Sequence, residues 1–120
     1  MITAPTGTSS SASTGGVFTA LTGAIGSGTQ VLSAPSNCRN VSVQGGQLYG
    51  SSGSAPFTNV FTIGTGVPSI SGQVATTLAG FVTTGASPYD FAFDPSGTVC
   101  YVADDRSIVN GGGLQVWKLN

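Results

Sequence analysis

The chain has 120 residues, three Lys or Arg, four acidic residues and no His, for a net charge of −1, so it has room for one domain. Because the chain has no His, it cannot by itself form a Ser-His-Asp or Cys-His catalytic site or a His-ligated zinc or haem site. Its three scattered basic residues are too few for nucleic acid binding. An apolar share of 39% argues against disorder, while 19 Gly, 6 Pro, 16 Ser and 15 Thr predict an all-β fold.

Along the chain, residues 1–16 are small and polar and are predicted to form a flexible leader rich in Ser, Thr and Gly. From Val17 onward, short apolar runs alternate with Gly, Pro, Asn and Ser, and several show the two-residue period of a half-buried strand. No run approaches the roughly 20 apolar residues of a membrane helix, so no membrane span is expected. The predicted strands are 17–19, 30–32, 40–43, 47–50, 59–63, 75–78, 90–93, 98–103 and 113–119.

An internal repeat of about 50 residues is the main organising signal. The strand at 40–43 matches the strand at 90–93 at an offset of 50, and Tyr49 matches Tyr101 at an offset of 52. A unit of this length with three or four strands is typical of a β-propeller blade, a four-stranded antiparallel sheet of ~40–50 residues that packs face to face with its neighbours.

The predicted fold is therefore all-β and consists of about two propeller blades, each a four-stranded antiparallel sheet. Strands in 17–36 are expected to pack on a neighbouring blade, 37–80 to form the first blade, and 81–120 to form a second blade that lacks its outer strand. Because one blade cannot bury both of its faces, the chain is expected to belong to a partial ring or to a ring closed by oligomerisation. Its expected partners are the remaining blades or identical chains.

The stretch Ser87–Asp104, SPYDFAFDPSGTVCYVAD, followed by Gly113–Trp117, GLQVW, carries a family resemblance. It resembles an NHL or lactonase-type (YVTN-like) propeller blade, with a Pro, two alternating hydrophobic residues, an Asp-x-x-Gly turn and a Tyr-Val-Ala-Asp strand. Residues 39–81 are similar to a more divergent blade of secreted or surface propellers. The resemblance implies a propeller fold. Lactonase-type relatives draw carboxylates and His from several blades, and this chain has no His, so no catalytic residue is assigned.

All four acidic residues lie within 90–105. Asp104 and Asp105 are candidate Ca²⁺ ligands, because carboxylates at loop tips suit cations that bind oxygen. The alternative is that the aspartates accept backbone N–H bonds in turns. Tyr89, in the loop that enters the second blade, and Arg106 are candidate ligand contacts. The alternative for Arg106, and the one favoured by its place next to Asp104 and Asp105, is a solvent-facing ion pair.

Cys38 and Cys100 are candidates for a disulfide if neighbouring blades bring their Cα atoms within about 7 Å. Otherwise they are buried free thiols. Asn40-Val41-Ser42 matches the N-glycosylation pattern, at the start of a predicted strand. Residues 1–38 and 40–89 carry no charged side chain, and so uncharged a surface favours an extracellular or cell-surface location.

Together these features predict a non-enzymatic extracellular propeller scaffold or interaction module that binds a protein or glycan ligand through its loops. No nucleic acid partner is expected, and Ca²⁺ is the one cofactor considered. Two alternatives stay open. One is a fragment of a lactonase- or hydrolase-like propeller enzyme with catalytic residues in other blades, and the other is a structural subunit of a filament or coat.

Overall fold

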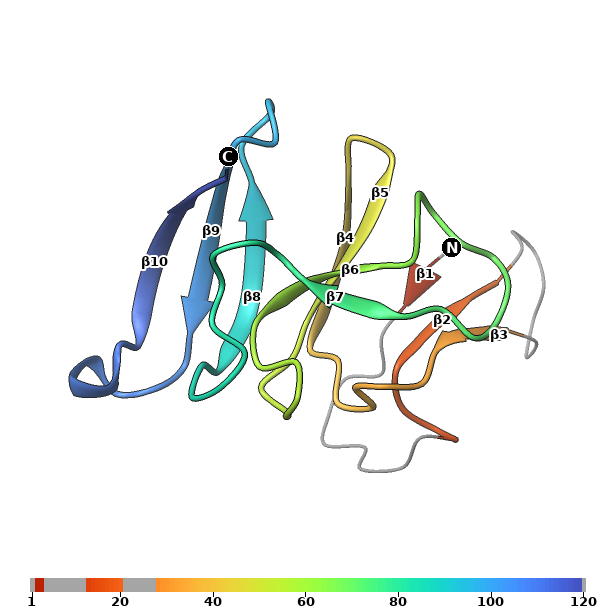
Figure 1. The fold of residues 1–120 in the computed structure, drawn as a ribbon, viewed down its shortest axis with the longest axis horizontal. Coiled ribbons are helices and arrows are strands. Elements are labelled where there is room, and N and C mark those ends of the chain that lie inside the picture. The colour runs from red at the N-terminus through yellow and green to blue at the C-terminus, as the bar shows by residue number, and fades with distance from the viewer. Residues whose placement is uncertain (1, 4–12, 21–27, 120) are drawn as a thin grey trace.

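The computed structural model of the chain describes residues 2–3, 13–20 and 28–119, which form three antiparallel sheets side by side (Figure 1). In each sheet, strands that follow one another in sequence are hydrogen-bonded neighbours. The N-terminal sheet contains β1 (Ile2–Thr3), β2 (Val17–Thr19) and β3 (Thr29–Leu32). The middle sheet contains β4 (Asn40–Gln44), β5 (Gln47–Ser51), β6 (Val60–Ile63) and β7 (Ala75–Thr77). The C-terminal sheet contains β8 (Pro88–Phe93), β9 (Val99–Asp104) and β10 (Gly113–Lys118).

The all-β prediction is confirmed, because the described residues contain no α-helix and one short 3₁₀ turn, Ile108–Asn110. Each predicted strand is present, and the ends agree within two residues. The described residues also include no helix long and apolar enough to cross a membrane.

The structure differs from the expected leader at both of its ends. Ile2 and Thr3 form β1 and pair with Thr19 and Phe18 of β2. The Gly16 amide donates to the Ser36 carbonyl at 2.7 Å. The physical reason is that strand β2 offers a free edge, whose backbone groups pair with any extended segment that reaches it. Residues 4–12 of the expected leader lie outside the described residues.

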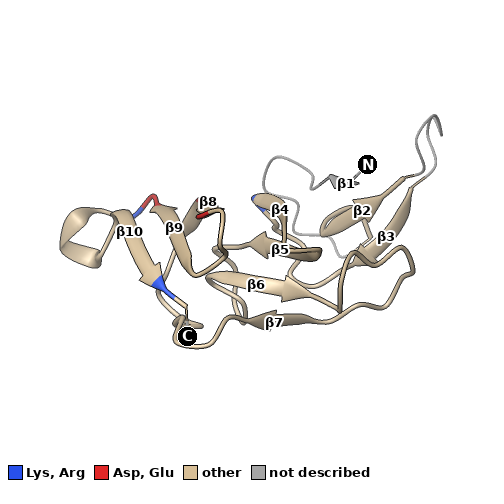
Figure 2. Cartoon of the chain, turned by 90° about the horizontal axis from the view of Figure 1, so that it is seen from above, with Lys and Arg blue, Asp and Glu red and all other residues tan. Residues whose placement is uncertain are grey.

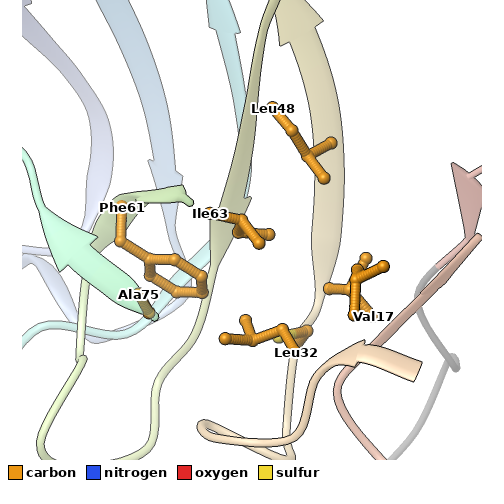
Figure 3. Packing of buried hydrophobic residues seen from close by; sticks show 8 residues of the cluster. Val17, Leu32, Leu48, Phe61, Ile63 and Ala75 are labelled. Atoms are coloured by element: carbon orange, nitrogen blue, oxygen red, sulfur yellow. The ribbon is translucent and has the colours of Figure 1, made fainter. Parts of the chain in front are cut away.

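The middle sheet is covered on both faces, and strand β6 contributes side chains to the packing on each of them. Its side chains alternate, so Phe61 and Ile63 face the N-terminal sheet while Val60 faces the C-terminal sheet. The first cluster, between the N-terminal and middle sheets, is drawn in Figure 3 and comprises Val17, Val31, Leu32, Cys38, Leu48, Phe61, Ile63 and Ala75. The second, between the middle and C-terminal sheets, comprises Val60, Phe81, Phe91, Cys100 and Val102, with Tyr49, Leu78, Phe93, Trp117 and Leu119 packed around it.

Positions 50 residues apart lie side by side where β4 meets β8. The Asn40 amide donates to the Asp90 carboxylate at one end of the two strands. At the other end, Gln44 Nε2 donates to the carbonyls of Asp94, at 3.4 Å, and Pro95, at 3.3 Å. The first strands of the middle and C-terminal sheets therefore run in the same direction, in the register of the sequence repeat.

The N-terminal sheet contains a further copy that the 50-residue spacing does not reveal. Val17-Phe18-Thr19 in β2 matches Val60-Phe61-Thr62, which includes most of β6, 43 positions later. Each of these strands pairs with the last strand of its own sheet. Val17 packs toward the middle sheet, as Val60 packs toward the C-terminal sheet. In both β2 and β6, the valine side of the strand therefore packs against the next sheet along the chain.

Candidate functional site

Five of the seven charged side chains gather at one end of the middle and C-terminal sheets: Arg39, Asp90, Asp104, Asp105 and Arg106. We call this region the charged end. It arises from topology, because antiparallel pairing places the starts of β4 and β8 and the end of β9 at the same end of the sheets. Figure 2 shows how few charged positions the chain has, with none on the N-terminal sheet.

Asp104 and Arg106 form the buried part of the charged end. The Asp104 side chain is 1% exposed, and its oxygens accept from Arg106 Nε at 2.8 Å and Nη2 at 2.9 Å, a two-point pair. The backbone amides of Ser87 and Arg106 donate to the same carboxylate, each at 3.0 Å. Arg106 Nη1 also donates to the Gly85 carbonyl. The pair therefore ties the segment before β8 to the turn after β9.

The same contacts set the ionisation of this pair. Burial acts to raise the pKa of the Asp104 carboxyl, but the hydrogen bonds from the Arg106 side chain and from the Ser87 and Arg106 amides outweigh it and hold that pKa below its usual value. The hydrogen bond to Asp104 likewise raises the pKa of Arg106. Both groups therefore stay charged around neutral pH.

Arg39 connects the middle sheet to the C-terminal sheet. Its Nη1 donates to Ser87 Oγ at 3.0 Å and to Asp105 Oδ2 at 3.2 Å. Its guanidinium carbon lies 5.6 Å from the centre of the Tyr89 ring, within the range of a cation–π contact. Gly53 lies beside it, and a Cβ at this position would be in tight contact with the guanidinium, 3.0 Å from Arg39 Nη2.

The exposed part of the charged end presents three kinds of group. The Tyr89 residue is 62% exposed, the Asp105 side chain is 46% exposed, and the Arg39 side chain is 23% exposed. Arg39 contacts both of the other two residues. An aromatic ring, a carboxylate and a guanidinium thus share one open surface. Such a surface offers an apolar face, a hydrogen-bond acceptor and a donor to a ligand.

No known protein family, curated protein or solved structure matches this chain.

The structure brings the predicted site residues Tyr89, Asp104, Asp105 and Arg106 together at the charged end. Asp104 and Asp105 are each engaged by an arginine. Within the described ranges, no three His, Cys, Asp or Glu side chains are placed to hold a metal ion together. The Ca²⁺ site stays a prediction.

The two cysteines are free thiols, contrary to a disulfide between them. Cys38 belongs to the first cluster and Cys100 to the second, so the middle sheet separates them. Burial raises the pKa of Cys38 to about 12 and that of Cys100 to about 11. The Asn40 side chain of the glycosylation pattern is half-buried and bonded to Asp90 and to the Val41 amide.

Sequence reasoning missed Arg39 and Ser87. Arg39 is the sole charged residue in the first 89 positions, and that isolation is a signal that could have identified it. Three buried polar groups near the connection between β5 and β6 were also missed. The Ser51 hydroxyl, the Thr58 hydroxyl and the Asn59 amide nitrogen lack a hydrogen-bond partner among the described residues.

Proposed function

We propose that this chain is a section of a β-propeller-type scaffold that acts as a non-enzymatic extracellular interaction module and binds a glycan at the charged end. The observation that carries the proposal is the shared open surface of Arg39, Tyr89 and Asp105, which come from three separate segments of the chain.

Support for the scaffold comes from the way the sheets stack. The middle sheet is a four-stranded antiparallel meander, and both of its faces are buried against other sheets. Residues 50 positions apart touch at both ends of β4. The neighbouring sheets have three strands each among the described residues, and face-to-face stacking of such antiparallel sheets is how propeller blades pack.

Support for a glycan comes from the chemistry of the exposed groups. The Tyr89 ring offers a flat apolar surface to the face of a sugar. The Asp105 carboxylate accepts hydrogen bonds from hydroxyl groups, and the Arg39 guanidinium donates to them. Oppositely charged groups that are already paired favour a neutral, hydroxyl-rich ligand over a strongly charged one, which would have to break the Arg39–Asp105 contact.

Support for a non-enzymatic role comes from Asp104, the most buried carboxylate of the cluster. A general acid that works near neutral pH needs a raised pKa. The pKa of Asp104 is instead lowered, and its oxygens are engaged by Arg106 and two backbone amides. Its geometry suits the positioning of loops.

The test is retention on a glycan array by the intact chain and two variants of one residue. Tyr89→Ala removes the ring and should abolish retention, whereas Tyr89→Phe keeps the ring and should preserve it. The Tyr89 residue is 62% exposed, so both variants should fold, which circular dichroism can verify. Retention of no glycan at all, or equal retention by Tyr89→Ala and the wild type, would overturn the proposal.

A further inference from the structure

The outward face of the C-terminal sheet is exposed and has an apolar centre. We call it the outer face. Its centre comprises Ala92, Tyr101, Ala103, Leu114 and Val116, and it carries a charge near each end, Asp90, which pairs with Ala103, and Lys118, which follows Val116 on the same side of β10. Cross-strand pairing places the central residues together, because Tyr101 pairs with both Ala92 and Val116, and Ala103 pairs with Leu114. Leu114 is 75% exposed and Val116 is 65% exposed.

The equivalent face of the middle sheet is covered. There Tyr49 pairs with both Ser42 and Thr62, as Tyr101 pairs with Ala92 and Val116. Ser51 pairs with Val60 as Ala103 pairs with Leu114. Tyr49 and Val60 lie in the second cluster, against the C-terminal sheet. Val60 is fully buried, whereas its counterpart Leu114 is open.

The centre of the outer face is less polar than the corresponding part of the covered face. Three polar positions of the middle sheet become apolar in the C-terminal sheet: Ser42 corresponds to Ala92, Ser51 to Ala103, and Thr62 to Val116. The last unit of a stack needs a polar outer surface to remain in water. The centre of the outer face is apolar instead, and its two charged groups, Asp90 and Lys118, lie near the ends of their strands.

A shallow hollow on the outer face can receive a side chain from a partner. It has a volume of about 170 Å³ and is lined by Asp90, Phe91, Ala92, Tyr101, Ala103 and Leu114.

We propose that the outer face binds the N-terminal sheet of a second copy of this chain, sheet against sheet. The N-terminal sheet already packs on the middle sheet through the face that carries Val17. The next residue, Phe18, corresponds to Phe61, which faces the preceding sheet, so Phe18 lies on the opposite side. The first 38 residues carry no charge, so this contact buries no charged group of that segment.

A head-to-tail contact of this kind uses two different surfaces, so each copy keeps one free surface for the next. It continues the stacking already present in the chain, in which each sheet meets the next through the face that carries Val17 or Val60. The inference uses this stacking, on which the scaffold part of the proposed function also rests, but it does not depend on glycan binding.

The test is sedimentation over a range of concentrations of the intact chain with two charged substitutions. The wild type should associate beyond a monomer. Leu114→Asp should shift it to monomer, because a carboxylate would be buried in the contact. The matched control is Val109→Asp, since Val109 is even more exposed, at 88%, and lies in the 3₁₀ turn, outside the strands that form the outer face. This variant should associate like the wild type.

Hydroxyl-radical footprinting then identifies the two surfaces. On association, labelling of Leu114 and of Phe18 should both fall. A wild type that stays monomeric at millimolar concentration, or unchanged association of Leu114→Asp, would overturn the proposal. Protection of Leu114 without Phe18 would overturn it too, because it would mean that two outer faces pack together. Tyr89→Ala should leave association unchanged, so a failure of glycan binding can be told apart from a failure of this contact.

Discussion

Replacing Asp104 by Asn tests whether the buried ion pair holds the charged end together. The carboxylate accepts two hydrogen bonds from Arg106 and one each from two backbone amides. Hydrogen bonds to a charged group contribute about 1.5–3 kcal/mol each. An Asn side chain keeps one neutral acceptor oxygen, but its NH₂ group replaces the second oxygen and would face N–H donors of Arg106 or Ser87 that it cannot accept from. Since Arg106 reaches water and is partly resolvated, we expect a net cost of about 3 kcal/mol.

The pH dependence of this cost has a defined sign. The pKa of Asp104 is lowered in the folded chain, so the carboxylate stabilises the fold above the pKa of an unfolded Asp, about 3.9. That contribution is lost as the pH falls through the folded pKa. The stability difference between the wild type and Asp104→Asn should therefore be full at pH 7 and should shrink as the pH falls below about 4.

Urea unfolding at several pH values measures this difference. Asp105→Asn is the matched control, because Asp105 is half exposed and pairs with Arg39 at the surface. It should cost less than about 1 kcal/mol. Equal costs for the two variants at pH 7, or a cost of Asp104→Asn that does not change with pH, would refute the reasoning.

Two further predictions concern the interior. Gly50→Ala should destabilise the fold by about 1–3 kcal/mol in urea unfolding, because its Cβ would lie 2.8 Å from the Phe61 ring; an unchanged midpoint would contradict this packing. Cys38 and Cys100 should resist iodoacetamide at pH 8 in the folded chain, since burial raises their pKa to about 12 and about 11, and both should react after denaturation. Mass spectrometry distinguishes the two states, and rapid labelling of the folded chain would show that the thiols are accessible.

Local sequence determined the strands of this protein. A strand requires alternation over four to six residues and Gly, Pro or Asn at its ends, and both signals are contained within the segment. The strands at 40–44 and 99–104 were predicted within a residue at each end. The repeat of 50 residues also predicted which strands are equivalent, since alternating apolar residues recur at the same places in both copies.

Strand β1 was not predicted, because two residues are too few to show alternation. Its pairing comes from the free edge of β2, a property of the folded sheet. The match between β2 and β6 escaped because the loops between repeats differ in length, which changes the offset from 50 to 43.

Tertiary structure alone decided which side chains of the charged end meet. Arg39 contacts Asp105 across 66 positions, and its isolation in the sequence says nothing about its partner. The sequence left open whether the two cysteines form a disulfide or stay as buried free thiols, and the structure places them on opposite faces of the middle sheet. Periodicity reports which face of a strand is buried, whereas these contacts depend on how one sheet is placed on the next. That placement is set by packing between segments far apart in the chain.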